Sequence, residues 1–215
     1  SSGRDVEMSV ASTKAFYSQV AAGSILAIAI NDILQPGLIQ QPKTQNLLES
    51  LINLPELMRK TLKTREHISN IAKRTVLSRR SWATVGNGPN TISAREIRIK
   101  SSELCYKATA NDVTEDKKHI DLSCEPLIVV CATGLNGSTA DDVSKEVSIF
   151  TAHKAVPVVI SDDDSERFEN CKNLIVVPKT EPDLSFILGC VAGHIFGYES
   201  ALAIDSSATI LREAR

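Results

Sequence analysis

The sequence predicts an α/β protein in which helices cover both faces of a parallel sheet. Three segments, at residues 126–133, 156–164 and 173–179, each contain an apolar run rich in β-branched residues, as is typical of strands buried on both faces. Helical segments at 139–155 and 184–204 alternate with these strands. Strands that alternate with helices form βαβ units, and such units build a parallel sheet.

The region before these strands is predicted to be largely helical. An apolar run that begins near Phe16 continues to a Pro-Gly turn at 35–38, where we expect the helix to end. Two more helices are expected within 44–78, and Pro55 is predicted to interrupt this segment. Beyond them, a short strand is expected to lead through a Gly-Asn-Gly turn into a helix at 93–108.

The composition limits the classes of partner. The chain has 215 residues, which suits one domain or one domain plus a piece of another. Its net charge is -2, and aromatic residues make up 4% of the chain. Nucleic-acid surfaces need clustered positive charge and often aromatic stacking platforms. We therefore expect neither a nucleic acid nor an anionic membrane surface as a partner.

The cysteines and the apolar segments bear on the compartment. The five cysteines are odd in number, and no two have a C-x-x-C spacing. We interpret them as reduced, mostly buried thiols of a cytoplasmic protein, and we predict no metal site and no cofactor. The apolar run at 20–30 is expected to be too short to span a bilayer. The polar N-terminal segment lacks the apolar region of a signal peptide.

Three loops follow predicted strands, at the edge where parallel sheets bind ligands. The loops "GNGPN" (86–90) and "ATGLNGST" (132–139) could hold an anion with backbone N–H groups, or could be a tight turn and a plain loop. The loop "SDDDSE" (161–166) could hold Mg²⁺ through carboxylates, or could be a charged loop with a helix cap. Residue types alone leave both interpretations open for each loop.

A stripe of charges marks the helix at 93–108. Glu96, Lys100 and Glu103 follow one another at steps of four and three, so they share one helix face. Such a stripe is either a set of ordinary ion pairs or a catalytic carboxylate beside an ammonium. We expect the stripe to lie at the ligand-bearing edge of the sheet. His119 lies in a polar stretch between helix and strand, which could be functional or structural. His194 lies in an apolar helix and is interpreted as a buried, hydrogen-bonded group.

Two segments together resemble a known family. The segment "VEMSVASTKAFYSQ" (6–19) resembles the end of the first sugar-isomerase (SIS) domain of the glutamine–fructose-6-phosphate aminotransferases, and "VGNGPNTISAREIRIKSSELCY" (85–106) resembles their second SIS domain. The resemblance covers nearly the whole chain. Aligned without gaps, the positions that match the second domain are Ala94, Glu96, Lys100, Glu103, Tyr106, Lys118, His119 and Leu122.

The resemblance implies a fold and a division of the chain. Each SIS domain of the family is a three-layer αβα sandwich with a mostly parallel, flavodoxin-like sheet. Residues 1–40 would be the C-terminal remnant of a first SIS domain. Residues 41–215 would be the second SIS domain, with leading helices at 41–80 and a divergent C-terminal tail at 205–215.

The resemblance also implies roles for matching residues. Glu103 falls on the family's base, which moves a proton between C1 and C2 during aldose–ketose isomerisation. Lys100 falls on a lysine near the sugar, where an ammonium can stabilise developing negative charge. His119 falls on the histidine associated with sugar-ring opening, which the partner subunit supplies. Ser12 and the backbone of Val10 fall on positions that contact the sugar.

By this resemblance the chain is the hexose 6-phosphate isomerase domain of a protein that makes glucosamine 6-phosphate. The implied partners are a sugar phosphate, a second copy in a homodimer, and upstream SIS and glutaminase domains, so the chain alone is expected to be inactive. The altered stretch around His119 and the unmatched tail "IDSSATILREAR" leave two alternatives. These are a sugar-phosphate-binding module without turnover and an SIS deglycase that acts on fructosamine phosphates.

Overall fold

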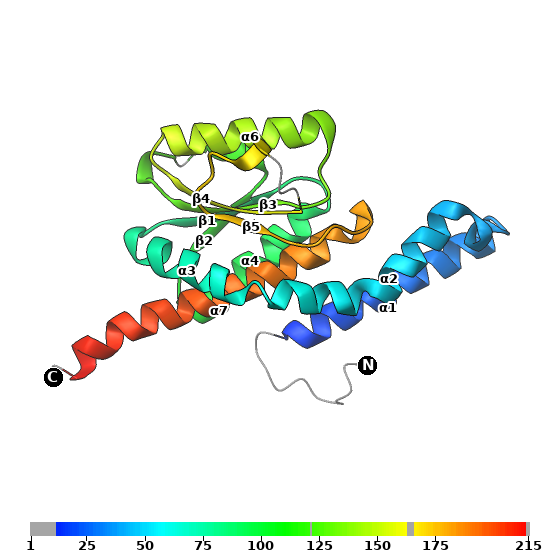
Figure 1. Cartoon of the computed structure of the whole chain (residues 1–215), viewed down its shortest axis with the longest axis horizontal. Coiled ribbons are helices and arrows are strands. Elements are labelled where there is room, and N and C mark those ends of the chain that lie inside the picture. The colour runs from blue at the N-terminus through cyan, green and yellow to red at the C-terminus, as the bar shows by residue number, and fades with distance from the viewer. Residues whose placement is uncertain (1–11, 121, 163–165, 214–215) are drawn as a thin grey trace. The chain divides into compact units, whose positions relative to one another are not determined.

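A computed structural model describes residues 12–120, 122–162 and 166–213 (Figure 1). The chain divides into two compact units, Ser1–Pro55 and Glu56–Arg215. The boundary falls inside a helix, and it does not test whether residues 1–40 derive from another SIS domain. That division of the chain stays a prediction.

The first unit holds α1 (Thr13–Leu34) and the beginning of α2 (Pro42–Leu62). The predicted end of the first helix is confirmed, because α1 stops just before the Pro-Gly turn, where Gly37 has a φ of 94°. The prediction that Pro55 interrupts the next segment was wrong, because α2 continues through it. Pro55 lies on an exposed side of α2, where water can hydrate the carbonyl that loses its helical donor.

The second unit is built around a five-stranded sheet in which each adjacent pair of strands is parallel. Its strands are β1 (Trp82–Gly86), β2 (Thr109–Asp112), β3 (Leu127–Ala132), β4 (Val156–Ser161) and β5 (Leu174–Val176). They lie in the order β2-β1-β3-β4-β5. This is the flavodoxin-like order, whose switch point lies between β1 and β3. The predicted fold class is therefore confirmed.

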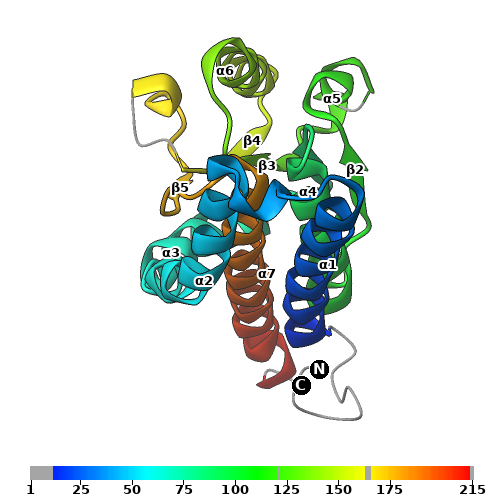
Figure 2. The same ribbon diagram turned by 90° about the vertical axis from the view of Figure 1, so that its right-hand side faces the viewer.

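Helices cover both faces of this sheet (Figures 1 and 2). On one face lie α3 (Arg65–Thr75), α4 (Asn90–Cys105) and α7 (Pro182–Glu213), and on the other lie α5 (Thr114–Ile120) and α6 (Gly137–Ala152). Short 3-10 turns occur at Leu38–Gln40, Val76–Ser78, Leu122–Cys124 and Glu166–Phe168. The three layers are those of an αβα sandwich.

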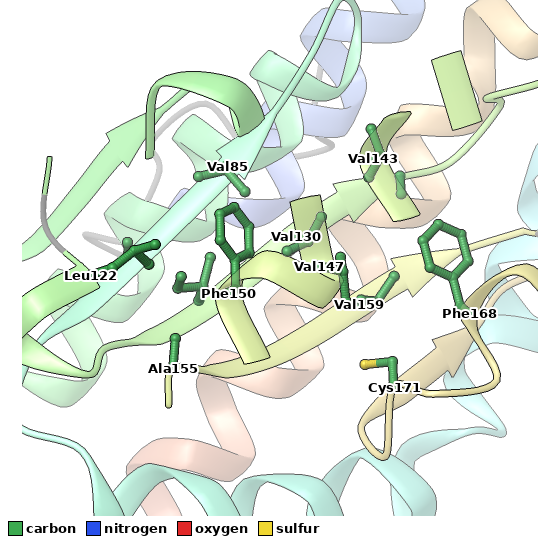
Figure 3. Packing of buried hydrophobic residues seen from close by; sticks show 13 residues of the cluster. Val85, Leu122, Val130, Val143, Val147, Phe150, Ala155, Val159, Phe168 and Cys171 are labelled. Atoms are coloured by element: carbon green, nitrogen blue, oxygen red, sulfur yellow. The ribbon is translucent and has the colours of Figure 1, made fainter. Parts of the chain in front are cut away.

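The apolar core beneath α6 explains why the strands are continuously hydrophobic. Successive side chains of a strand point to opposite faces, and both faces are covered here, so β1 and β3 are buried along their whole length. Phe150 of α6 is fully buried against this face (Figure 3). The cluster comprises Ala83, Val85, Leu122, Ile128, Val130, Ala132, Val143, Val147, Phe150, Ala155, Val159, Phe168 and Cys171.

One strand and one helix were not expected. Residues 109–120 form β2 and α5, where the sequence shows a polar stretch. β2 is short and lies at the edge of the sheet, so it lacks the apolar run of a central strand. Its position is defined by pairing with β1, and the Asn111 amide donates a 3.0 Å hydrogen bond to Thr84 Oγ1.

The predicted burial of most cysteines is confirmed, since Cys105, Cys131, Cys171 and Cys190 are buried and Cys124 is exposed, all as free thiols. The prediction about membrane-spanning length was wrong for the run at 20–30, because it belongs to the 22-residue helix α1. Two helices, Thr13–Leu34 and Pro182–Ser207, are long and apolar enough to cross a membrane by length and composition alone. The apolar window of the second is 72% buried inside the fold, as in the core helix of a soluble protein.

Candidate functional site

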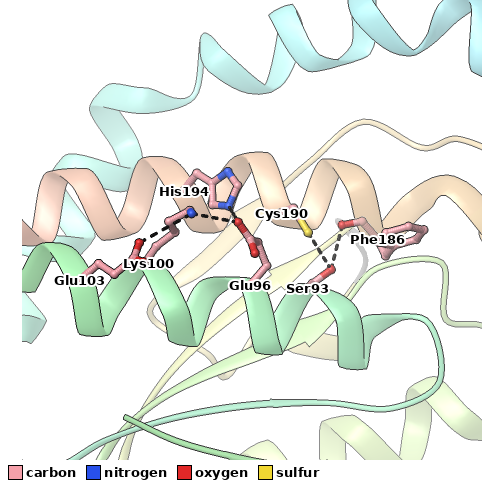
Figure 4. Close-up of polar contacts among 7 residues, drawn as sticks. All are labelled: Ser93, Glu96, Lys100, Glu103, Phe186, Cys190 and His194. Carbon is pink, nitrogen blue, oxygen red and sulfur yellow. Dashed lines mark hydrogen bonds and ion pairs between the residues drawn. The ribbon is translucent and has the colours of Figure 1, made fainter. Parts of the chain in front are cut away.

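The charged stripe of α4 forms one connected cluster. Lys100 Nζ lies 3.1 Å from Glu96 Oε1 and 3.8 Å from Glu103 Oε2 (Figure 4). The shared helix face predicted from the spacing is thus confirmed. The catalytic roles of Lys100 and Glu103 stay predictions, because contact within a helix is also what ordinary ion pairs make.

Exposure separates the three side chains. Those of Glu96 and Lys100 are 11% and 5% exposed, whereas that of Glu103 is 31% exposed. Glu103 Oε2 itself is buried and makes no hydrogen bond within the described part of the chain. The stripe therefore combines an enclosed Glu96–Lys100 ion pair with the partly exposed side chain of Glu103, which lies beside the Lys100 ammonium.

A fourth residue joins the cluster from α7. His194 Nε2 lies 3.1 Å from Glu96 Oε1, the same oxygen that Lys100 contacts (Figure 4). The interpretation of His194 as an enclosed, hydrogen-bonded group is confirmed, but its partner was missed. No spacing in the sequence links positions 96 and 194, so only packing of α7 on α4 could have revealed the contact.

The surroundings of Glu96 favour its charged form. Burial alone would raise the pKa of Glu96, but hydrogen bonds from His194 and Lys100, together with their charges, bring that pKa below its ordinary value. Glu96 is thus a carboxylate at neutral pH. An ionised carboxylate only accepts hydrogen bonds. The Nε2 of His194 is therefore the donor in its hydrogen bond to Glu96.

The close approach of α4 and α7 depends on small residues of α7. A Cβ placed on Gly193 would collide with the side chain of Ile97. Ser93 Oγ donates a 2.8 Å hydrogen bond to the carbonyl oxygen of Phe186 and lies 3.5 Å from Cys190 Sγ. Ile97 is fully buried because Gly193 leaves room for it.

The stripe does not lie at the carboxyl edge of the sheet, so the expectation that placed it there was wrong. α4 begins at that edge with Asn90, and Glu103 follows 13 residues later, about 20 Å along the axis at roughly 1.5 Å per residue. The site faces α7 instead. A cavity of about 400 Å³ does open at the carboxyl edge, and it is lined by Asn87, Thr114, Glu115, Thr139, Asp142, Val143, Lys145 and Glu146.

The three loops at this edge are tied to one another by their own groups. Asn90 donates a 2.8 Å hydrogen bond to the carbonyl oxygen of Thr133 and accepts hydrogen bonds from the N–H and hydroxyl of Thr133 at 3.2 and 2.9 Å. The N–H of Gly134 donates to Asp162 Oδ1 at 2.9 Å. These contacts favour the turn interpretation of the loops and give Asp162 a structural role.

The other residues named from the sequence stay predictions. Val10 lies outside the described residues, and Ser12, with a φ of 43°, directly precedes α1 in the first unit. His119 lies in α5, and its side chain also lies outside the described part. Among described residues, no group of three His, Cys, Asp or Glu side chains is arranged to hold a metal ion.

Comparison with known proteins points in one direction. No protein-family model matches the chain. The chain is 26% identical over 203 residues to glutamine–fructose-6-phosphate aminotransferase (isomerizing) of Zymomonas mobilis, a match that covers 91% of this chain and 32% of that protein. The chain thus spans about a third of the length of the curated relatives it matches.

The solved structures agree on the fold. The C-terminal domain of glucosamine-fructose-6-phosphate aminotransferase from Francisella tularensis superposes with a TM-score of 0.79 at 20% identity, over 92% of this chain and 56% of that one. The sugar isomerase domain of an RpiR transcription factor from Sphaerobacter thermophilus gives a TM-score of 0.54 at 13% identity, over 81% of this chain and 98% of that one. The chain therefore has the fold of an SIS domain and resembles, over most of its length, the isomerase part of glutamine–fructose-6-phosphate aminotransferase.

Proposed function

We propose that this chain is the sugar-phosphate isomerase domain of an aminotransferase-like protein, and that Glu103 is its base. The observation that carries the proposal is the position of Glu103, the most exposed member of the stripe, with its buried Oε2 3.8 Å from the Lys100 ammonium. A general base needs access to substrate, and a nearby positive charge stabilises its carboxylate. Glu103 is partly exposed and lies beside the Lys100 ammonium, whereas Glu96 is enclosed.

The proposed chemistry is a ketose-to-aldose isomerisation of a hexose 6-phosphate. The Glu103 carboxylate removes a proton from C1 of the ketose to give an enediol-like intermediate. Its carboxyl group, which can exchange this proton with solvent, then delivers a proton to C2, while the proton of the C1 hydroxyl is transferred to the C2 oxygen. The ammonium of Lys100 stabilises the negative charge that develops on the sugar oxygens. This electrostatic stabilisation is stronger in a low-polarity site than in water. Glu96 stays charged and holds Lys100 in place.

Further components of the site are part of the same proposal. Val10, Ser12 and His119 supply sugar contacts and ring opening, and His119 acts from the partner subunit of a homodimer. The chain works within a longer cytoplasmic protein with upstream SIS and glutaminase domains, which would make glucosamine 6-phosphate. The support is the relatives, of which the chain spans about a third, and the joint match of residues 6–19 and 85–106.

The test is exchange of solvent deuterium into C2 of a hexose 6-phosphate by the intact protein. We expect exchange with the unaltered protein and a loss of about 10²–10⁴-fold in Glu103→Gln, the usual contribution of a general base. Glu49→Gln, a change at an exposed position of α2, is the matched control and should leave exchange intact. Undiminished exchange in Glu103→Gln would exclude this residue as the base.

A second candidate function is a sugar-phosphate-binding module without turnover. It is motivated by the altered stretch around His119 and by the unmatched tail at 205–215. The RpiR structure belongs to a transcription factor, so the fold by itself does not select catalysis. Binding of a hexose 6-phosphate without C2 exchange would favour the module.

An SIS deglycase shares the base and differs in the direction of nitrogen transfer. It would release an amine from a fructosamine phosphate, and Glu103 would again move a proton between C1 and C2. Incubation with a fructosamine 6-phosphate and measurement of released amine separates it from the isomerase. Amine release without a glutamine requirement would favour the deglycase.

A further inference from the structure

We propose that His194 is a positioning residue of the site, which orients Glu96 and thereby holds the Lys100 ammonium within reach of Glu103. This inference deepens the proposed function and rests on it for its catalytic consequence. His194 lies in α7, whereas the three residues of the stripe lie in α4. The site is thus assembled from two helices that are remote in sequence, and its alignment depends on how they pack.

The geometry places two donors on one oxygen. His194 Nε2 and Lys100 Nζ each lie 3.1 Å from Glu96 Oε1 (Figure 4). A carboxylate oxygen can accept both bonds because it has more than one lone pair. The two donors together fix the rotation of the Glu96 carboxylate, and a fixed carboxylate defines where Lys100 must lie.

Position matters because Lys100 has a second neighbour. Its Nζ is 3.8 Å from Glu103 Oε2, which is beyond hydrogen-bond distance but close for an ion pair. Without the bond from His194, the enclosed Glu96 carboxylate would accept a second hydrogen bond from the Lys100 ammonium to satisfy its remaining lone pairs. Lys100 would then move toward Glu96, and Glu103 would lose part of its electrostatic support.

Within this cluster, Glu96 is the charged partner of His194. Glu199, one and a half turns further along α7, is engaged by Arg65 of α3 at 2.6 Å. Gly193 directly precedes His194 on α7 and allows Ile97 to approach that helix closely. The imidazole is 11% exposed, so it is held in the helix interface instead of rotating in solvent.

The experiment compares two substitutions in the intact protein. His194→Gln keeps an N–H donor near the position of Nε2, and His194→Phe keeps the ring volume but removes the donor. Carboxyl ¹³C NMR follows the pKa of Glu96, and ¹⁵N NMR follows the ammonium of Lys100. We expect His194→Phe to raise the pKa of Glu96 and shift the Lys100 signal, and His194→Gln to restore both.

Deuterium exchange at C2 gives the catalytic readout. His194→Phe is expected to lower kcat at least about 10-fold with KM nearly unchanged, because alignment of the ammonium acts in the transition state. His194→Gln is expected to recover most of this loss. The exposed His153 at the end of α6 supplies the matched control, His153→Phe, which should change neither NMR signal nor rate.

The outcomes separate this inference from the proposed function. If the unaltered protein shows no exchange, the isomerase proposal fails, and the NMR signals of Glu96 and Lys100 still test the positioning by His194. If His194→Phe leaves both signals and the exchange rate as they are, the positioning role is overturned. Circular dichroism of each variant identifies any unfolding. If His194→Phe unfolds, His194→Gln is the variant that tests the proposal. A role in packing alone predicts that the Gln and Phe variants behave alike.

Discussion

The side chain of Ile97 fills the space that a Cβ on Gly193 would need. This contact brings α4 and α7 close enough for His194 to reach Glu96. The packing of two apolar positions thus decides the geometry of a charged cluster.

Gly193→Ala is expected to destabilise the protein by about 1–3 kcal/mol, the usual cost of overpacking a core. The added methyl group would collide with Ile97, whose side chain is fully buried and cannot move aside. The measurement is urea unfolding followed by circular dichroism. The control is Gly23→Ala in α1, where nothing lies within 4 Å of the new Cβ, and which should be neutral or stabilising by up to about 1 kcal/mol. The double variant Gly193→Ala with Ile97→Val should recover part of the loss.

The stability that Glu96 contributes is expected to disappear in acid. The pKa of Glu96 is lowered in the folded protein, so the unfolded chain binds its proton more readily and stability rises with pH. The contribution is present above the ordinary glutamate pKa of about 4.3 and is lost as pH falls through the lowered value. The measurement is the difference in urea midpoint between the unaltered protein and Glu96→Gln from pH 7 to pH 3. That difference should shrink toward low pH, and a constant difference would contradict the assignment.

Asn90→Ala is expected to destabilise the second unit by about 2–3 kcal/mol, because it leaves the buried N–H and hydroxyl of Thr133 without their acceptor. Asn90 is 1% exposed, so water cannot replace it readily. Thermal unfolding gives the measurement. Asn31→Ala provides the control, since the amide of Asn31 makes a single exposed bond within α1. Equal stability of the two variants would show that the Asn90–Thr133 contacts contribute little.

Much of the fold follows from local sequence. β3 and β4 are apolar runs rich in β-branched residues. Helices on both faces of a sheet bury the side chains of such strands. β2 and α5 were missed because an edge strand needs no apolar run and α5 is one polar helix of seven residues. Pro55 was misjudged because a proline on an exposed helix face loses one hydrogen bond that water can replace.

The sequence by itself determined that Glu96, Lys100 and Glu103 share a helix face, since the period of a helix depends only on residue spacing. Tertiary structure decided which of them is enclosed, that His194 joins them, and that the stripe faces α7 and not the edge of the sheet. Burial and contacts between residues 98 positions apart depend on how two helices pack. That packing depends on the fit of Ile97 against Gly193, and the spacing of residues in the sequence does not reveal this fit.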